Sequence, residues 1–235
     1  MVSSAARCLL ANKVVKTLKT IVGVAALSLL PLQAAAGVII TNATLGLYNS
    51  GLGDIHAIDG PGGFLPGPNI SEGDPTIVLG ADPGFAFTPQ FGTDWLGGDY
   101  SGGAWSAAPV AIPIGWTVNT ETAIVYDFNL ATASSLHLDL GVDNGIVVWL
   151  DGAFLFGATA PGGVNINEYD VDVASLSAGA HALQILRADH GGAQGYAISV
   201  DAQPLVVPEP SSLLLSAISL AGLRLIRRRK APTPR

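Results

Sequence analysis

The sequence predicts an all-β protein: a single jelly-roll-like antiparallel β-sandwich, preceded by an N-terminal signal helix and followed by a C-terminal transmembrane helix. Three observations predict the sandwich. Short β-rich segments recur through residues 37–204 with turn residues between them. Apolar and polar residues alternate within the clearest segment, and apolar patterns with a helical period are absent. Short strands in this arrangement are typical of sandwiches and jelly rolls.

The first half of the body predicts few strands and long loops. Residues 38–48 begin with a β-branched run that predicts a first strand, and residues 76–79 predict a short one. Residues 51–74 are dominated by Gly, Pro, Asp and Asn, so we expect an ordered, irregular loop. Residues 81–109 are rich in Gly but dense in aromatic residues, which argues against disorder. We expect these loops to fold back and cap one end of the core.

The second half carries the clearest strand pattern. In residues 135–142 the side chains of Leu136, Leu138, Leu140 and Val142 alternate with polar or small ones, which places them on one face. Asn144-Gly145 then predicts a two-residue hairpin to a strand at 146–150, because both turn positions need a positive φ. Asp151-Gly152 repeats this signal. The remaining expected strands are 122–130, 153–156, 168–173, 180–187 and 195–201.

Three stretches resemble the galactose-binding-like jelly rolls. They are V-D-N-G-I-V-V-W-L-D-G-A-F, then L-S-A-G-A-H-A-L-Q-I-L-R, and the closing G-G-A-Q-G-Y-A-I-S-V. The resemblance covers roughly residues 105–201 and implies the sandwich fold. It implies no particular ligand, because this fold carries binding modules with different targets and many with structural roles.

The N-terminus has the three parts of a Sec signal peptide. Arg7 and three lysines precede the apolar run of residues 21–30, and Ala34-Ala35-Ala36 offers small residues for cleavage before Gly37. Cys8 precedes the apolar run, which excludes a lipoprotein signal. We therefore expect residues 1–36 to be removed and residues 37–204 to form the exported domain.

The C-terminus, residues 205–235, combines Pro208-Glu209-Pro210, an apolar segment at 211–226 and the basic run that contains Arg227, Arg228 and Arg229. A helix over 211–226 would be about 24 Å long, short of the ~30 Å hydrocarbon core, so it is a poor permanent anchor. This order resembles the PEP-CTERM sorting signal of Gram-negative bacteria. The resemblance implies recognition by a membrane-embedded exosortase, removal of the tail and release to the surface or matrix. The alternative is an ordinary tail anchor after a proline-rich linker.

The charge of the body is hidden by its two targeting segments. Between residues 37 and 207 lie 17 of the 18 acids but only one base, Arg187, so the net charge is 1 − 17 = −16. Such a domain cannot neutralise phosphates, which excludes nucleic acid as a partner. We expect the unprocessed chain to contact the membrane only through its C-terminal helix. Without Cys8 the body has no thiol for disulfides, metal binding or catalysis.

Three groups of residues are candidates for binding. Asp143, Asn144 and Asp151 would supply oxygen ligands to Ca²⁺, the one cofactor we consider, or hold sugar hydroxyls, or would simply form hairpin turns. Arg187, Asp189 and His190 would grip a sugar or carboxylate, or Arg187 would pair with a structural carboxylate.

The third group is aromatic. Trp95, Tyr100 and Trp105 in the Gly-rich loop would be exposed and form a stacking platform for sugars, or they would pack in the core. The four histidines have no metal-binding spacing, and no G-x-S-x-G elbow is present. We therefore expect a non-enzymatic protein that meets the Sec machinery and exosortase during export and binds exopolysaccharide. The alternatives are a structural or adhesive matrix protein bridged by cations and, third, a glycan hydrolase.

Overall fold

The structure is a computed structural model, which describes residues 36–55, 76–83, 91, 94–160, 163–189 and 191–205. All of these belong to the compact unit that begins at Ala35. The expected signal helix, the sorting motif and the expected helix over 211–226 lie outside the described residues. Within the part of the chain that is described, no helix is long and apolar enough to cross a membrane.

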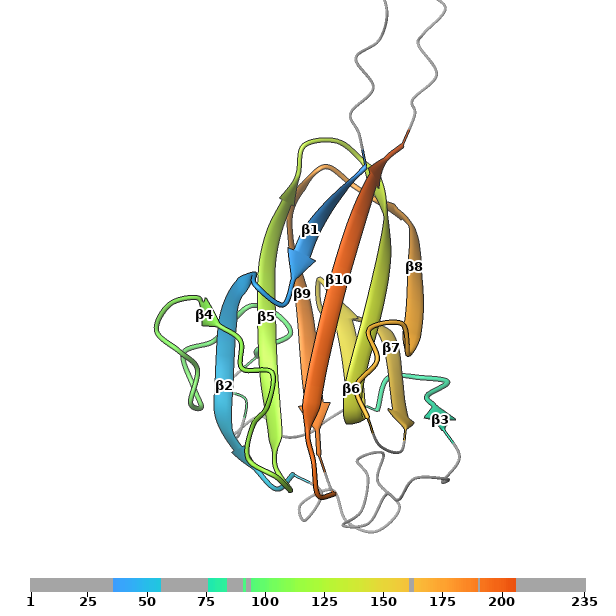
Figure 1. Ribbon diagram of the computed structural model, residues 1–235. Coiled ribbons are helices and arrows are strands. Elements are labelled where there is room, and N and C mark those ends of the chain that lie inside the picture. The colour runs from blue at the N-terminus through green and yellow to red at the C-terminus, as the bar shows by residue number, and fades with distance from the viewer. Residues whose placement is uncertain are drawn as a thin grey trace, which may run out of the picture. The chain divides into compact units, whose positions relative to one another are not determined.

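The described body is built from strands, which confirms the all-β prediction (Figure 1). Every pairing between them is antiparallel. In chain order the strands are β1 (Gly37–Thr41), β2 (Leu45–Gly53), β3 (Ile77–Val78), β4 (Val110–Ala111), β5 (Glu121–Leu130), β6 (Ser134–Leu150), β7 (Ala153–Ala160), β8 (Tyr169–Leu176), β9 (Gly179–Ala188) and β10 (Gly195–Pro204).

The strands form two layers that share β6. The first sheet has the order β1–β10–β6–β8. The second has the order β4–β2–β5–β9–β6–β7–β3. The first half of β6 pairs in the first sheet and its second half in the second, so hydrogen bonding runs from one layer into the other.

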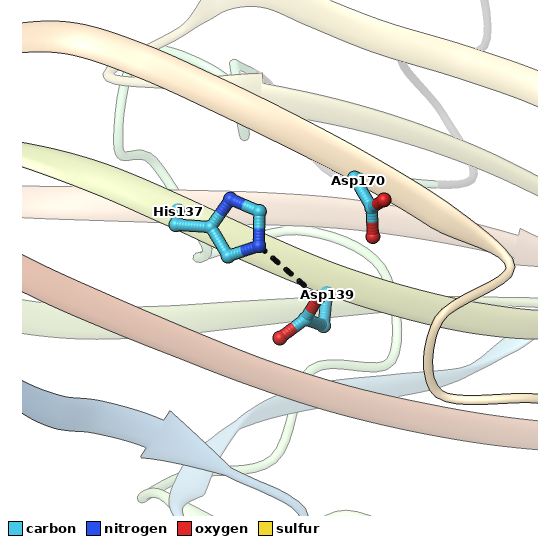
Figure 2. Close-up of side chains that lie close together, drawn as sticks. All are labelled: His137, Asp139 and Asp170. Carbon is cyan, nitrogen blue, oxygen red and sulfur yellow. Dashed lines mark ion pairs between the residues drawn. The ribbon is translucent and has the colours of Figure 1, made fainter.

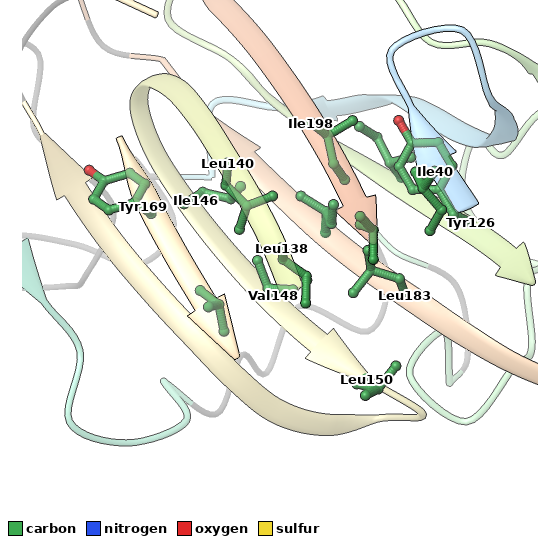
Figure 3. Close-up of a cluster of buried hydrophobic side chains, with 14 of the residues drawn as sticks. Ile40, Tyr126, Leu138, Leu140, Ile146, Val148, Leu150, Tyr169, Leu183 and Ile198 are labelled. Atoms are coloured by element: carbon green, nitrogen blue, oxygen red, sulfur yellow. The ribbon is translucent and has the colours of Figure 1, made fainter. Parts of the chain in front are cut away.

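The predicted hairpin at Asn144-Gly145 is wrong, because the strand segments before and after it do not pair with each other. The two halves of β6 do run in opposite directions, as Figure 3 shows between Leu140 and Ile146. Asp143 lies opposite Gly195 of β10, and Gly145 lies opposite Ala188 of β9. They pair with different neighbours, however, so the chain folds over from one sheet to the other (Figure 3). Asp151-Gly152 does form the predicted tight turn, with φ values of 52° and 76°.

The main core lies between the two halves of β6 and their sheets. The alternating side chains of the first half, Leu136, Leu138, Leu140 and Val142, are all buried, as predicted. They share one cluster with Ile146, Val148 and Leu150 of the second half (Figure 3). Burial of such side chains from water is the main stabilising contribution to a sandwich of this kind.

A second apolar cluster covers the other face of the second sheet. Val147 and Trp149 of β6 and Leu186 of β9 pack there against Phe91 and Trp95 of the Gly-rich loop. The expectation that this loop caps one end of the core is therefore wrong, because its aromatic side chains pack on a sheet face. The second half of β6 is consequently buried on both faces, which suits its unbroken apolar sequence.

Both ends of the body lie at the same end of the first sheet. Gly37 at the start of β1 pairs with Ala202 near the end of β10, and Figure 1 shows the two strands side by side. Strand β10 ends at Pro204, so the sheet stops before the Pro208-Glu209-Pro210 motif begins.

Candidate functional site

The outer face of the first sheet carries a cluster of polar side chains in two cross-strand rows. In the first row Asp172 of β8, His137 of β6 and Asp201 of β10 lie opposite one another. In the second row Asp170 of β8 lies opposite Asp139 of β6. The side chains point outward because the residues between them along each strand face the core. Figure 2 shows His137, Asp139 and Asp170 converging above β6 and β8.

His137 is the centre of this cluster. Its Nδ1 lies 2.7 Å from an oxygen of Asp172, and its Nε2 lies 3.2 Å from an oxygen of Asp139. The hydrogen bond with Asp172 raises the pKa of His137 above its ordinary value; partial desolvation opposes this, and the charges of Asp139 and Asp172 add to it. The His137 side chain keeps 45% of its surface exposed, so the cluster is open to solvent.

A groove of about 430 Å³ lies beside this cluster, on the Asp172 side of the imidazole. Its polar lining comes from three strands: Ser135 and His137 of β6, Asp172 of β8, and Asp201 and Gln203 of β10. These groups offer a hydroxyl, an imidazole, two carboxylates and an amide. A surface of this kind can both donate and accept hydrogen bonds.

The aromatic loop does not present the expected exposed platform. Trp95 is only 7% exposed; it stacks on Phe91 at 5.1 Å and meets the edge of Trp149 at 5.5 Å between ring centroids. The expected exposure of Trp95 is therefore wrong. Tyr100 and Trp105 are half-buried, and the indole N–H of Trp105 donates to the carbonyl of Phe91. Whether either side chain contacts a sugar stays a prediction.

Arg187 is buried in an aromatic cage rather than in an ion pair. Its guanidinium lies 4.3 Å from the ring centroid of Trp116 and 4.6 Å from that of Tyr196. Its Nε donates to the Thr122 hydroxyl at 3.1 Å and its Nη1 to the Pro113 carbonyl at 2.9 Å. Among the described residues no carboxylate forms a salt bridge with Arg187, so the expected ion pair is wrong.

The cage also removes Arg187 from any ligand. The side chain is 0% exposed, and burial lowers the pKa of Arg187 while the neighbouring tyrosines act in the opposite direction. Asp189 is buried as well and accepts a hydrogen bond from the Asn119 backbone N–H at 3.1 Å. His190 lies outside the described residues. Arg187 and Asp189 are therefore buried and do not reach the surface, where a ligand would bind, in this structure.

The three candidate calcium ligands are not brought together. Asp143 and Asn144 lie where β6 crosses between sheets, and Asp151 lies beyond the far end of the second half of β6. The six residue steps from Asn144 to Leu150 span roughly 20 Å at ~3.3 Å per residue.

Each end of this strand segment has its own hydrogen bonds. Asp143 accepts from Asn144 at 2.6 Å and from the Gly163 N–H at 3.2 Å. Asp151 pairs with His181 at 2.7 Å. A single ion shared by the three is excluded, and a separate ligand role for each stays a prediction.

Sequence reasoning missed the cluster around His137. The alternation in residues 135–142 did place His137 and Asp139 together on the outer face. The other members come from β8 and β10, more than thirty residues later, and only the register that pairs His137 with Asp172 and Asp201 brings them close. A search for metal-binding spacing along the chain cannot detect ligands contributed by neighbouring strands.

Three comparisons with known proteins were informative to different degrees. A family model described as the PEP-CTERM protein-sorting motif matches residues 206–230, which confirms the resemblance of the C-terminus. No curated protein matches the sequence.

Solved structures with some similarity include a β-galacturonidase from Eisenbergiella tayi bound to glycerol, at 12% identity and a TM-score of 0.38, with 74% of this chain and 25% of that chain covered. Others are the PA14 domain of the MpAFP antifreeze protein (20% identity, TM-score 0.30, 72% and 86% covered) and a family 35 carbohydrate-binding module from an environmental isolate (17% identity, TM-score 0.26, 40% and 74% covered).

The chain spans a quarter or less of the first three enzymes that it resembles. At these TM-scores the likenesses carry no argument about function. The sorting motif is informative by itself: a chain that carries it is an exported protein.

Proposed function

We propose that this chain is an exported, exosortase-processed, non-catalytic protein of the cell surface or extracellular matrix that binds carbohydrate in the groove beside His137. The observation that carries the binding proposal is the groove itself. Its volume of about 430 Å³ falls within the range of small-ligand sites. Its hydroxyl, amide and carboxylate groups match the donors and acceptors of sugar hydroxyls.

The arrangement of the chain ends supports processing by a protease. Strand β10 ends at Pro204, so the hydrogen-bonded sheet does not include the Pro208-Glu209-Pro210 motif. Removal of the tail beyond that point leaves every described strand intact. Intact-mass spectrometry of the protein from its producing bacterium, with and without exosortase, tests this step. We expect the N-terminal segment to be removed in both strains and the C-terminal tail to be removed only when exosortase is present. A chain that keeps its tail in both strains would refute processing by exosortase.

The absence of catalysis is proposed from the placement of the acidic side chains. Glycosidases need two carboxyl groups about 5–10 Å apart on either side of the scissile bond. Two carboxylates, Asp172 and Asp201, line the groove, but they stand on one open strand face with His137 between them, and Asp172 pairs with its imidazole at 2.7 Å. Asp139 and Asp170 lie close together outside the groove. Hydrolysis of a polysaccharide that a single Asp→Asn change abolishes would overturn this part of the proposal.

Glycan arrays with the exported protein test the binding proposal. We expect binding to at least one glycan, and the double variant Ser135→Ala/Gln203→Ala should lose it, because both side chains line the groove. Tyr100→Ala is the matched comparison, since Tyr100 belongs to the aromatic loop on the second sheet. If Tyr100→Ala loses binding and the double variant keeps it, the binding site lies in the aromatic loop, as predicted from the sequence, and not in the groove.

A second function from another class is a structural or adhesive matrix protein whose acidic surfaces are bridged by divalent cations. The net charge of −16 over residues 37–207 favours it, because such surfaces repel one another until cations are present. Light scattering of the exported protein with and without Ca²⁺ separates the two functions. Reversible association that needs the cation, together with no glycan binding, would favour the matrix role.

A further inference from the structure

The hydrogen bonds of His137 define which of its nitrogens is available. A carboxylate can only accept, so the 2.7 Å contact between Asp172 and Nδ1 places a proton on Nδ1. In the neutral imidazole the lone pair of Nε2 then points toward Asp139, whose nearest oxygen lies 3.2 Å away. Two acceptors face each other there, and they repel unless a cation or a second proton lies between them.

The register of the first sheet adds further negative charge at the same place. Asp139 lies directly opposite Asp170, and like charges in directly opposed cross-strand positions are destabilising. No lysine occurs between residues 37 and 207, and the only arginine there, Arg187, is fully buried in its aromatic cage. The body therefore has no lysine, and no accessible arginine, to place between Asp139 and Asp170.

From this arrangement we propose that His137, Asp139 and Asp170 bind a first-row divalent metal ion, for which Zn²⁺ is the probe. One ligand atom from each of the three lies within 4.8 Å of the others (Figure 2). Ligand atoms on a tetrahedral Zn²⁺ are about 3.4 Å apart at bond lengths of about 2.1 Å, so small rotations of exposed side chains close the site.

The ligand set selects the class of metal. One imidazole and two carboxylates suit Zn²⁺ and its neighbours, whereas Ca²⁺ takes six to eight oxygen ligands. Asp172 has a supporting role, because a carboxylate on the other nitrogen fixes the orientation of a metal-binding imidazole and raises its basicity. This site differs from the calcium ligands considered above, none of which belongs to it.

Isothermal titration of the untagged exported protein, after treatment with EDTA, tests the proposal. We expect one Zn²⁺ per chain, with Ca²⁺ binding much more weakly. His137→Gln and Asp170→Asn should abolish binding, and Asp172→Asn should weaken it about 10–100-fold as a supporting residue. Circular dichroism checks that these exposed-face variants keep the fold.

His181 provides the matched control. Its Nδ1 also pairs with a carboxylate, Asp151, at 2.7 Å, but its Nε2 contacts the carbonyl of Ser177 at 2.9 Å, and no second carboxylate of the described residues pairs with it. His181→Gln should therefore bind Zn²⁺ as the unchanged protein does. The proposal is overturned if the unchanged protein binds no Zn²⁺, if Ca²⁺ binds more tightly, or if His137→Gln and Asp170→Asn leave the affinity unaltered. Glycan binding plays no part in any of these outcomes.

Discussion

Replacing Arg187 by methionine should lower the free energy of unfolding by about 2–5 kcal/mol. The guanidinium donates two hydrogen bonds, each contributing about 1.5–3 kcal/mol from a charged donor. Its contacts with Trp116 and Tyr196 contribute about 2 kcal/mol each in a desolvated site. Against this stand the cost of removing the cation from water, which is several kcal/mol, and the buried Nη2, which has no hydrogen-bond partner among the described residues and costs about 1–3 kcal/mol; methionine incurs neither. The contacts are the larger effect.

Urea unfolding of the exported protein, followed by tryptophan fluorescence, measures this difference. Arg187→Lys should be destabilised at least as much, because a single ammonium group cannot reproduce the planar stacking and both hydrogen bonds. Thr122→Val separates one hydrogen bond from the rest and should cost about 1.5–3 kcal/mol. An Arg187→Met variant as stable as the unchanged protein, or more stable, would refute the reasoning and mark the buried cation as a net cost.

Three further predictions concern packing and charge. Trp95→Ala should lower the free energy of unfolding by about 3–5 kcal/mol, because this buried ring packs the loop against the second sheet. An unchanged midpoint of thermal unfolding would show that this packing does not stabilise the protein. Gly141→Ala should lower the free energy of unfolding by about 1–3 kcal/mol, since its methyl group would lie 2.1 Å from the carbonyl oxygen of Asn165. Gly192→Ala, which has open space around it, is the control and should change the free energy of unfolding by less than about 0.5 kcal/mol in the same thermal-unfolding measurement. In metal-free protein the raised pKa of His137 means that its protonation stabilises the fold fully below about pH 6.5 and that this contribution disappears as pH rises through the folded-state pKa. Unfolding at pH 5.5 and 8.5 should show it, and His137→Gln should reduce the difference, leaving the contribution of His181, whose pKa is lowered by burial but raised more by its hydrogen bonds with Asp151 and Ser177.

The strands were predictable because their signals are local. The alternation of residues 136–142 and the Asp151-Gly152 turn depend on neighbouring residues only, and both are present as expected. The Asn144-Gly145 signal is also local, and the chain does reverse there. Whether the two halves of β6 pair with each other depends on which other strands compete for their edges. Here β8 and β10 occupy one half and β7 and β9 the other, and no local pattern contains that information.

The predicted sites differed from the structure for a related reason. Arg187 was expected to pair with a carboxylate because carboxylates outnumber it 17 to one. Composition shows how many carboxylates the chain has but not where they lie. The rings that contact the Arg187 guanidinium belong to Trp116, Tyr196 and Tyr48. In the same way, aromatic density in residues 81–109 predicted order correctly. It could not predict that Trp95 packs on a sheet face instead of facing solvent.

The distribution of basic residues connects export with the chemistry of the folded surface. Ten of the 11 lysines and arginines lie in residues 1–36 or 208–235, the two segments that we propose direct export and that the positive-inside rule would orient. Only one remains between residues 37 and 207. A surface without lysine or arginine can balance its carboxylates only with protons or with ions from the medium. Among the described residues, the cluster around His137 is one place where the register of the sheet brings carboxylates together in this way.

This reasoning predicts that a cation supplied by the chain should replace the ion. Ser199 of β10 lies opposite Asp139 on the outer face of the first sheet. A Ser199→Lys ammonium beside Asp139 should stabilise the EDTA-treated protein by about 0.2–1 kcal/mol and weaken Zn²⁺ binding, because both cations need the same carboxylates. Ala107→Lys, an exposed position in another part of the body, adds the same charge and should do neither. If Ser199→Lys leaves Zn²⁺ affinity unchanged, the ion does not depend on Asp139 and the reasoning is refuted. If both variants weaken binding equally, net charge rather than this cluster governs the binding of cations.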